Sequence, residues 1–282
     1  MKKGLLIIGL ILTTFFINSR YLFSAEISKL RIISLAPSTT EILFALGLDE
    51  EIVGVSLFCN YPQKAKTKEK VGTFSQPNIE KILFLKPHII FCTGLEQAPI
   101  VRQLEQLNLK VYVSDPSNIE ELFNSIKDMA RLTGKEKEAD ALIKKMHSDI
   151  EEVNSKVKLT HKKDWPKVFV EIWYEPLMTV GNSSFVDELL TLAGGINIAH
   201  DTKRSYSYFS SEQVIKRDPQ LIILTYMSKE QPVKIVQERL GWNKISAVKN
   251  NRIYNDINPD VLLRPGPRLV DGLKELHKRL YP

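Results

Sequence analysis

A segment that occurs twice restricts the fold of this 282-residue chain more than any other feature of its sequence. Residues 78–93 align without a gap on residues 210–225, with Glu80 on Glu212 and the apolar positions coinciding. In each copy a helical pattern leads through a proline into a short apolar run, which is typical of a helix followed by a buried strand. The repeat therefore predicts two lobes of related architecture.

A second, weaker match supports this interpretation. Residues 41–47 align on residues 188–194, each segment begins with a glutamate, and the two matches come in the same order in each half. The alternative is that any helix–proline–strand unit resembles any other without a shared architecture. The coincidence of Glu80 with Glu212 favours the two-lobe interpretation.

Short runs rich in β-branched residues alternate with helical patterns along the chain. The runs are continuous and apolar, as buried parallel strands are, and the alternation is typical of an α/β fold. We predict two Rossmann-like lobes with strands at residues 31–35, 52–56, 88–93, 110–114, 167–173, 221–226 and 252–255. Residues 204–208, Arg-Ser-Tyr-Ser-Tyr, are expected to form a polar loop.

Two helix starts carry the pattern of a capping box. Ser38 is followed by Glu41 and Ser117 by Glu120. In a capping box the hydroxyl and the carboxylate each accept a hydrogen bond from a backbone amide that the first helical turn leaves unpaired. The sequence therefore predicts helices that begin at these two serines.

A long amphipathic pattern between the halves predicts their connection. Apolar residues recur at helical spacing over residues 135–158, and a helix of this length is about 36 Å long. We expect an N-terminal lobe at 29–133, a single rigid connecting helix at 135–158 and a C-terminal lobe at 165–282. A connector this stiff predicts only small closure of the lobes on a ligand.

The first 25 residues are expected to form a signal peptide. Lys2 and Lys3 precede an apolar run that ends at Phe16, and Ala25 supplies the small residue before the cleavage point. The apolar run is short for a membrane span, which needs about 20 residues, although an uncleaved anchor is the alternative. Because no cysteine lies near the cut for lipid attachment, we expect a free periplasmic protein.

Charge distribution and sequence motifs argue against nucleic-acid binding, a metal site and an enzyme. The net charge of +6 falls to +3 without residues 1–25, and its dispersed lysines do not indicate nucleic-acid binding. Cys59 and Cys92 could pair in an oxidising compartment or remain free thiols. No metal motif is present, so we expect neither a metal site nor a cofactor. The absence of GxSxG, P-loop and GxGxxG motifs argues against an enzyme; a scaffold or adhesion module is a third class, which nothing in the sequence favours.

Four segments in order resemble the periplasmic binding proteins for vitamin B12 and iron chelates: residues 31–47, 71–82, 193–199 and 264–268. The resemblance implies a ligand held between two lobes and a monomer that delivers it to the permease of an ABC importer. It also implies docking through one glutamate per lobe. Those glutamates fall on Glu80 and Glu212, the pair that the repeat had already aligned.

Within this family the vitamin B12 binders are most similar, which implies cobalamin or a related corrinoid as the ligand. The residues that fall on ligand-binding positions are Pro37, Phe58, Phe74, Trp173, Tyr174, Tyr206 and Arg264. Aromatic faces can bury a flat corrin ring while polar groups orient it. Cys92 departs from the pattern, because a tryptophan of the B12 binders falls there.

Some of these residues have a structural alternative. Trp173 follows an apolar strand and could end the core, and Arg264 could start a helix or form a surface ion pair. The ligand also has alternatives, a ferric siderophore or haem. A siderophore usually requires several converging basic residues, whereas only Arg264 supplies clear positive charge here. Haem requires an axial Tyr or His, for which Tyr61, Tyr174 and Tyr206 are candidates.

Overall fold

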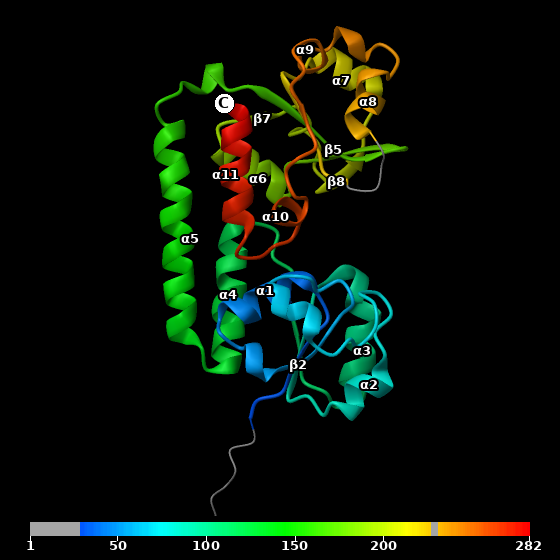
Figure 1. Cartoon of the computed structure of the whole chain (residues 1–282), viewed down its shortest axis with the longest axis vertical. Helices are drawn as coiled ribbons and strands as arrows, with labels where there is room; N and C mark the ends of the chain where they lie inside the picture. The colour runs from blue at the N-terminus through cyan, green and yellow to red at the C-terminus, as the bar shows by residue number, and fades with distance from the viewer. Residues whose placement is uncertain (1–28, 227–230) are drawn as a thin grey trace, which may run out of the picture.

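Two separate β-sheets, each flanked by helices, form the two halves of the molecule (Figure 1). The computed structural model describes residues 29–226 and 231–282. The predicted signal peptide and its cleavage point near Ala25 lie outside the described residues. Within those ranges, none of the helices combines the length and the apolar character that crossing a membrane requires.

The N-terminal half contains a four-stranded parallel sheet in the order β2-β1-β3-β4. Parallel neighbours need a crossover connection, and helices supply most of it here. The strands are β1 (Ile32–Ser34), β2 (Ile52–Val55), β3 (Ile89–Cys92) and β4 (Val111–Val113). The helices are α1 (Pro37–Ala45), α2 (Ile79–Phe84), α3 (Ala98–Gln106) and α4 (Ile119–Thr133), with short 3-10 turns at Asp49–Glu51, Gln63–Thr67 and Leu95–Gln97.

The C-terminal half contains a mixed sheet in the order β10-β9-β5-β6-β8, with β7 paired to β5. Its strands are β5 (Lys167–Tyr174), β6 (Leu177–Val180), β7 (Ile196–Asn197), β8 (Tyr206–Tyr208), β9 (Leu221–Leu224) and β10 (Ile253–Tyr254). Its helices are α6 (Phe185–Leu192), α7 (Ser211–Arg217), α8 (Pro232–Gln237), α9 (Ser246–Lys249), α10 (Asp260–Leu263) and α11 (Leu269–Leu280), with 3-10 turns at Lys162–Asp164 and Trp242–Lys244.

The polar loop predicted at residues 204–208 is wrong, because Tyr206–Tyr208 form the edge strand β8. Tyr206 pairs with Val180 and Tyr208 with Met178 in an antiparallel ladder with β6. The Tyr-Ser-Tyr alternation has the period of two that a strand requires. Polar side chains are tolerated at this sheet edge, and β8 thereby places the Tyr206 ring at a fixed position.

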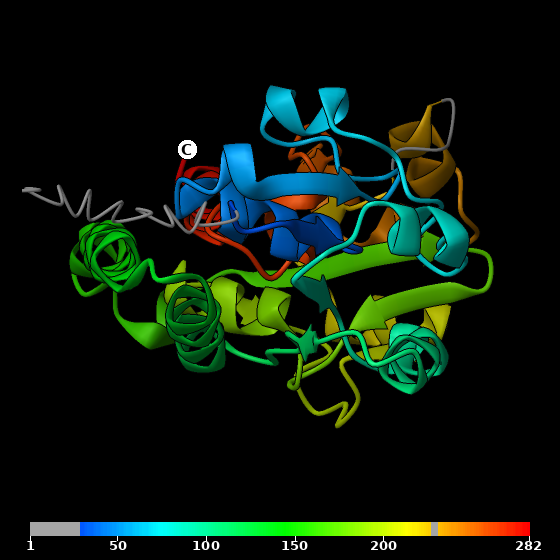
Figure 2. The same cartoon turned by 90° about the horizontal axis from the view of Figure 1, so that it is seen from below.

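Helix α5 (Glu136–Val157) runs along one side of the molecule from the N-terminal half to the C-terminal half (Figure 1). It packs on α4 in the first half and on α6 and α11 in the second, and Figure 2 shows α4 and α5 side by side at one edge. Gly134 permits the tight turn between α4 and α5, because its φ of +69° lies in the left-handed region. Helix α5 is therefore packed against both halves, through α4 in the first and through α6 and α11 in the second.

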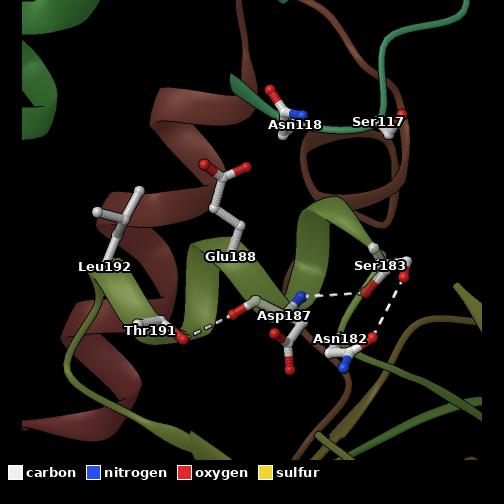
Figure 3. Close-up of a pocket in the computed structure, with 9 residues that line it drawn as sticks. Ser117, Asn118, Asn182, Ser183, Asp187, Glu188, Thr191 and Leu192 are labelled. Atoms are coloured by element: carbon white, nitrogen blue, oxygen red, sulfur yellow. Dashed lines mark hydrogen bonds between the residues drawn. The ribbon is translucent and has the colours of Figure 1, made fainter. Parts of the chain in front are cut away.

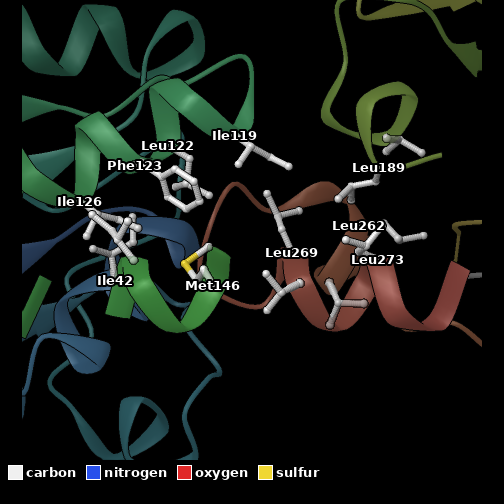
Figure 4. Close-up of a cluster of buried hydrophobic side chains, with 14 of the residues drawn as sticks. Ile42, Ile119, Leu122, Phe123, Ile126, Met146, Leu189, Leu262, Leu269 and Leu273 are labelled. Atoms are coloured by element: carbon white, nitrogen blue, oxygen red, sulfur yellow. The ribbon is translucent and has the colours of Figure 1, made fainter. Parts of the chain in front are cut away.

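One apolar core extends through both halves (Figure 4). Ile42 and Ile126 lie at its N-terminal end, Met146 of α5 lies in the middle, and Leu269 and Leu273 continue it into the C-terminal half. Two smaller buried clusters cover the other faces of the sheets. The space between the halves is thus packed with side chains on the α5 side.

Both predicted capping boxes differ from the observed helix starts. Helix α1 begins at Pro37 after Ala36, without a side-chain cap, and Glu41 lies inside the helix. At α4 the cap is shifted by one residue: Asn118 accepts from the Glu121 amide, and the Glu121 carboxylate accepts from the Ser117 amide at 2.7 Å. Proline at the first position replaces the α1 cap, because its missing N–H is one the helix start leaves unpaired.

Candidate functional site

A cleft of about 570 Å³ lies between the two halves. From the N-terminal half its walls come from the residues that follow β1, β3 and β4, where the carboxyl ends of parallel strands meet. The lining residues are Ala36, Pro37, Ser38, Phe74, Thr93, Gly94, Glu96, Asp115, Pro116, Ser117, Ser183, Ser184, Phe185, Ser205, Tyr206, Leu263, Arg264 and Pro265.

Gln97 supports the N-terminal wall of the cleft from behind. Its fully buried side chain accepts from the Thr93 amide at 2.8 Å and donates to the carbonyls of Leu35 at 3.0 Å and Phe74 at 2.8 Å. One amide group therefore joins the ends of β1 and β3 to the turn that carries Phe74. Sequence reasoning missed Gln97, although its place two residues before a proline in a βα turn is a weak signal for such a role.

Gly94 allows a close approach of two loops in the same wall. A Cβ atom at Gly94 would lie 1.9 Å from the Asp115 carboxylate, so this carboxylate would have to move. The turn before α2 has a similar requirement, since Gly72 has a φ of +102° and lies against the backbone of residues 76–78. These two glycines let the loops that follow β2, β3 and β4 converge on the cleft.

The C-terminal wall is formed by β8 and the start of α6. Ser184 caps α6 by accepting from the Asp187 amide at 3.2 Å and donates its own hydroxyl to the Gly181 carbonyl at 2.7 Å. Ser205 donates to the carbonyl of Ser183 at 2.7 Å. These bonds fix the serines next to Tyr206, whose side chain is 49% exposed.

Four of the predicted ligand residues line this cleft together: Pro37, Phe74, Tyr206 and Arg264. Phe58, Trp173 and Tyr174 do not line it. Phe58 is 55% exposed in the loop after β2, and Trp173 lies on the β5–β6 hairpin, where its indole donates to the Glu175 carbonyl at 2.8 Å. Tyr174 packs against Tyr226, with ring centroids 5.8 Å apart.

Arg264 lines the cleft, but its charge is already engaged by carboxylates. It contacts Asp260 at 2.8 Å and Glu41 at 3.5 Å, and it donates to the Asn60 side chain at 2.7 Å. The ion-pair alternative for Arg264 is therefore present in the structure, with one carboxylate from each half, Glu41 and Asp260, as its partners.

The charge of the cleft disfavours an anionic ligand. Among the described lining residues, Glu96 and Asp115 are acidic and exposed, and Arg264 is the one basic residue. The remaining polar groups are mainly hydroxyls, which can both donate and accept hydrogen bonds. Such a surface suits a neutral ligand with amide or hydroxyl edges better than a ligand with several carboxylates.

A second cavity of about 580 Å³ adjoins the cleft and shares Ser117, Ser183 and Ser184 with it (Figure 3). Glu188 extends from α6 toward the segment of Ser117 and Asn118 in the other half. Its carboxylate accepts from the Ile119 amide at 2.9 Å, at the start of α4. This contact joins the halves directly.

Glu188 gives a prediction for stability against pH. Burial raises its pKa above the ordinary value of 4.5, Asp187 and Glu121 raise it further, and the Ile119 amide opposes both. The stability that this group contributes is therefore fully present below pH 4.5 and is lost as the pH rises through the raised folded-state pKa. We expect Glu188→Gln to have a higher Tm than the parent at pH 7, with the difference vanishing near pH 4. Thermal melts from pH 4 to 7 would contradict this if the difference were constant.

The two cysteines are free thiols in the structure. Cys59 lies 3.1 Å from the hydroxyls of Thr40 and Ser56, and burial raises the pKa of Cys92 to about 12. Of the alternatives that the sequence left open, the structure has the unpaired one. Buried thiols with raised pKa values are unreactive, which indicates packing roles.

The two aligned glutamates lie in equivalent places. Glu80 is in the first turn of α2 after the Asn78 cap, and Glu212 is in the first turn of α7 after the Ser210 cap. Both are exposed, and α2 and α7 both lie on the side of the molecule opposite α5, one toward each end of the long axis (Figure 1).

Comparison with known proteins identifies the class. The family described as periplasmic binding protein matches residues 32–258. The chain is 36% identical over 257 residues to the ABC transporter substrate-binding lipoprotein YvrC of Bacillus subtilis (strain 168), covering 89% of this chain and 80% of that protein. It is 30% identical over 275 residues to the vitamin B12-binding protein of Vibrio cholerae serotype O1, covering 96% of each.

A solved structure gives the same result. A possible iron-binding (periplasmic solute-binding) protein from Staphylococcus epidermidis ATCC 12228 superimposes with a TM-score of 0.80 at 32% identity, covering 89% of this chain and 98% of the other. The chain belongs to the periplasmic binding protein family, whose members are substrate-binding proteins of ABC transporters. The predicted two-lobed α/β fold and the prediction that the chain is not an enzyme are thereby confirmed.

Proposed function

We propose that this protein captures cobalamin or a related corrinoid in the cleft and delivers it to the permease of an ABC importer. The lining carries the proposal: Phe74 and Tyr206 come from opposite halves, and the same lining contains several serine and threonine residues and little net charge. Aromatic faces bury the area of a flat ring, and the hydroxyls can bind the amides at its edge. Similarity to the Vibrio cholerae vitamin B12-binding protein supports the same ligand.

Titration of the purified protein with cyanocobalamin, haemin and ferric siderophores tests this choice. We expect cyanocobalamin to bind most tightly, and Phe74→Ala to weaken it about tenfold, since burial of an aromatic side chain contributes roughly 1.5–3 kcal/mol. Phe84→Ala is the matched control, because Phe84 is 82% exposed on α2 and does not line the cleft. Tighter binding of haemin or a siderophore would refute the corrinoid proposal.

Haem or a ferric chelate is the second candidate ligand. Tyr206 lines the cleft, and a tyrosine can serve as an axial haem ligand. The Staphylococcus epidermidis relative is described as possibly iron-binding. Haem bound in this way would give a tyrosinate absorption spectrum that Tyr206→Phe abolishes. The lack of converging basic residues among the described lining residues weighs against an anionic chelate.

Delivery is proposed to depend on Glu80 and Glu212. A first-turn carboxylate is stabilised by the helix dipole and is exposed for pairing with arginines of a partner. We expect Glu80→Ala combined with Glu212→Ala to leave cyanocobalamin affinity unchanged and to reduce uptake through the reconstituted importer at least about tenfold. Glu105→Ala, an exposed acid on α3, is the control. Equal loss of affinity and uptake would mean that the glutamates serve binding instead.

Export and oligomeric state complete the proposal. The protein is expected to be exported by its signal peptide, cleaved near Ala25, and to act in the periplasm as a monomer. Mass analysis of the protein recovered from the periplasm of an expressing cell would determine both the cleavage point and the state.

A further inference from the structure

The weaker of the two internal sequence matches, residues 41–47 on residues 188–194, leads to a pair of contacts between the two halves of the molecule. Glu41 and Glu188 are its aligned first residues, and they lie on the equivalent helices α1 and α6. Each carboxylate binds the opposite half of the molecule. We infer that Glu41 and Glu188 are positioning residues that together fix the separation of the two cleft walls.

Glu41 holds the segment between α10 and α11. Its carboxylate, 3% exposed, accepts two hydrogen bonds from Arg268, at 2.8 Å from Nε and 2.5 Å from Nη2. The Arg268 guanidinium also stacks on the Tyr61 ring, 3.9 Å from its centroid. Glu41 and Tyr61 of the N-terminal half thus both contact Arg268 of the C-terminal half. Its neighbour Arg264 lines the cleft and lies within 3.5 Å of the same carboxylate.

Glu188 makes the reciprocal contact. It extends from the C-terminal half to the Ile119 amide, at 2.9 Å, and so pairs one of the unpaired amides at the start of α4 (Figure 3). Ser117, in the same segment, lines both cavities. Moving this segment would therefore move a wall of the cleft.

Energetics favour a positioning role over a purely stabilising one. A buried ion pair such as Glu41–Arg268 often returns little more than its desolvation cost, and in some proteins such pairs are retained because they specify one geometry. For Glu188, the raised pKa means that the charged form is disfavoured in the folded protein. A carboxylate whose charged form is disfavoured, and which nevertheless joins two walls of a ligand site, is explained better by the geometry it enforces.

A distance measurement between spin labels at Arg102 of α3 and Lys216 of α7, both exposed, tests the inference on the full-length mature protein. Glu41→Gln and Glu188→Ala are expected to broaden the distance distribution. Glu188→Gln should retain the parental distribution, because its amide oxygen can still accept from Ile119. Arg268→Lys, which keeps the charge but loses the two-bond geometry, is a milder lesion that should also broaden it.

Glu171→Gln is the matched control. Glu171 is fully buried and accepts two hydrogen bonds from Arg239, at 2.8 and 2.9 Å, but both residues belong to the C-terminal half. This variant should lose stability and keep the parental distances. Parental distributions in both Glu41→Gln and Glu188→Ala would overturn the inference.

The ligand arm rests on the proposed function. Cyanocobalamin affinity should fall at least about tenfold in Glu41→Gln and Glu188→Ala and be restored in Glu188→Gln. Broadened distances with unchanged cyanocobalamin affinity would overturn the role in capture. If the parent protein does not bind cyanocobalamin, the proposed ligand fails, whereas the distance measurement still decides whether the two glutamates set the separation.

Discussion

Replacing Arg268 with leucine is expected to lower the free energy of unfolding by about 3 kcal/mol, because a buried carboxylate loses its two-bond partner. Glu41 would remain as a charge that is 3% exposed, with Arg264 at 3.5 Å as its remaining cation. This residual contact places the expected loss at the lower end of the range for broken buried pairs. Urea unfolding at pH 7 measures it.

Two comparisons make the Arg268 experiment specific. Arg131→Leu breaks an exposed pair with Asp128 and should cost at most about 1 kcal/mol. Adding Glu41→Leu to Arg268→Leu should recover part of the loss, since removing both charges is less costly than leaving one unpaired. An equal loss in the free energy of unfolding for Arg268→Leu and Arg131→Leu would show that the buried pair contributes no more to stability than the exposed pair.

Gln97→Leu is expected to lower the free energy of unfolding by about 3 kcal/mol or more, since three backbone groups lose their partner and each unpaired buried group costs roughly 1–3 kcal/mol. The groups are the Thr93 amide and the carbonyls of Leu35 and Phe74. Because Phe74 lines the cleft, cyanocobalamin binding should weaken about tenfold as well.

The control for Gln97 is Gln103→Leu, an exposed position on α3 that should change stability by no more than about 0.5 kcal/mol. Urea unfolding and ligand titration on the same samples separate the two effects of Gln97→Leu. Full stability in Gln97→Leu would mean that water or a rearranged loop replaces the amide. Full affinity would mean that the Phe74 turn keeps its position without it.

Local pattern was sufficient for most of the fold. Every strand expected from an apolar run is present, with its ends moved inward by one or two residues at most positions, because burial selects the same β-branched residues that the pattern shows. The strands that sequence reasoning missed, β6, β7 and β8, are short and belong to the mixed part of the C-terminal sheet. Tyr206–Tyr208 have the alternation of a strand, but the polar composition of this segment favoured a loop.

The cleft could be predicted only in part. Pro37 follows β1 and Tyr206 begins β8, so the strand pattern helps to place these two residues. Phe74 lies in the turn before α2 and Arg264 caps the end of α10, and the family resemblance located both. Gln97 could not be found this way, because its role depends on the three backbone groups to which its side chain is hydrogen-bonded. The same holds for Glu41, whose capping-box pattern is purely local, whereas its actual partner Arg268 lies 227 residues away along the chain.

The apolar core that continues through α5 into both halves has a consequence for how such chains can be recombined. Neither half buries its apolar surface alone, since Met146 and Leu269 belong to the same core cluster as Ile42 and Ile126. The halves should therefore melt in one transition. A chimaera with one half from a relative would need matching residues along this shared core. Cutting the chain near residue 135 would leave two fragments with exposed apolar surface that aggregate, and not two independently folding domains.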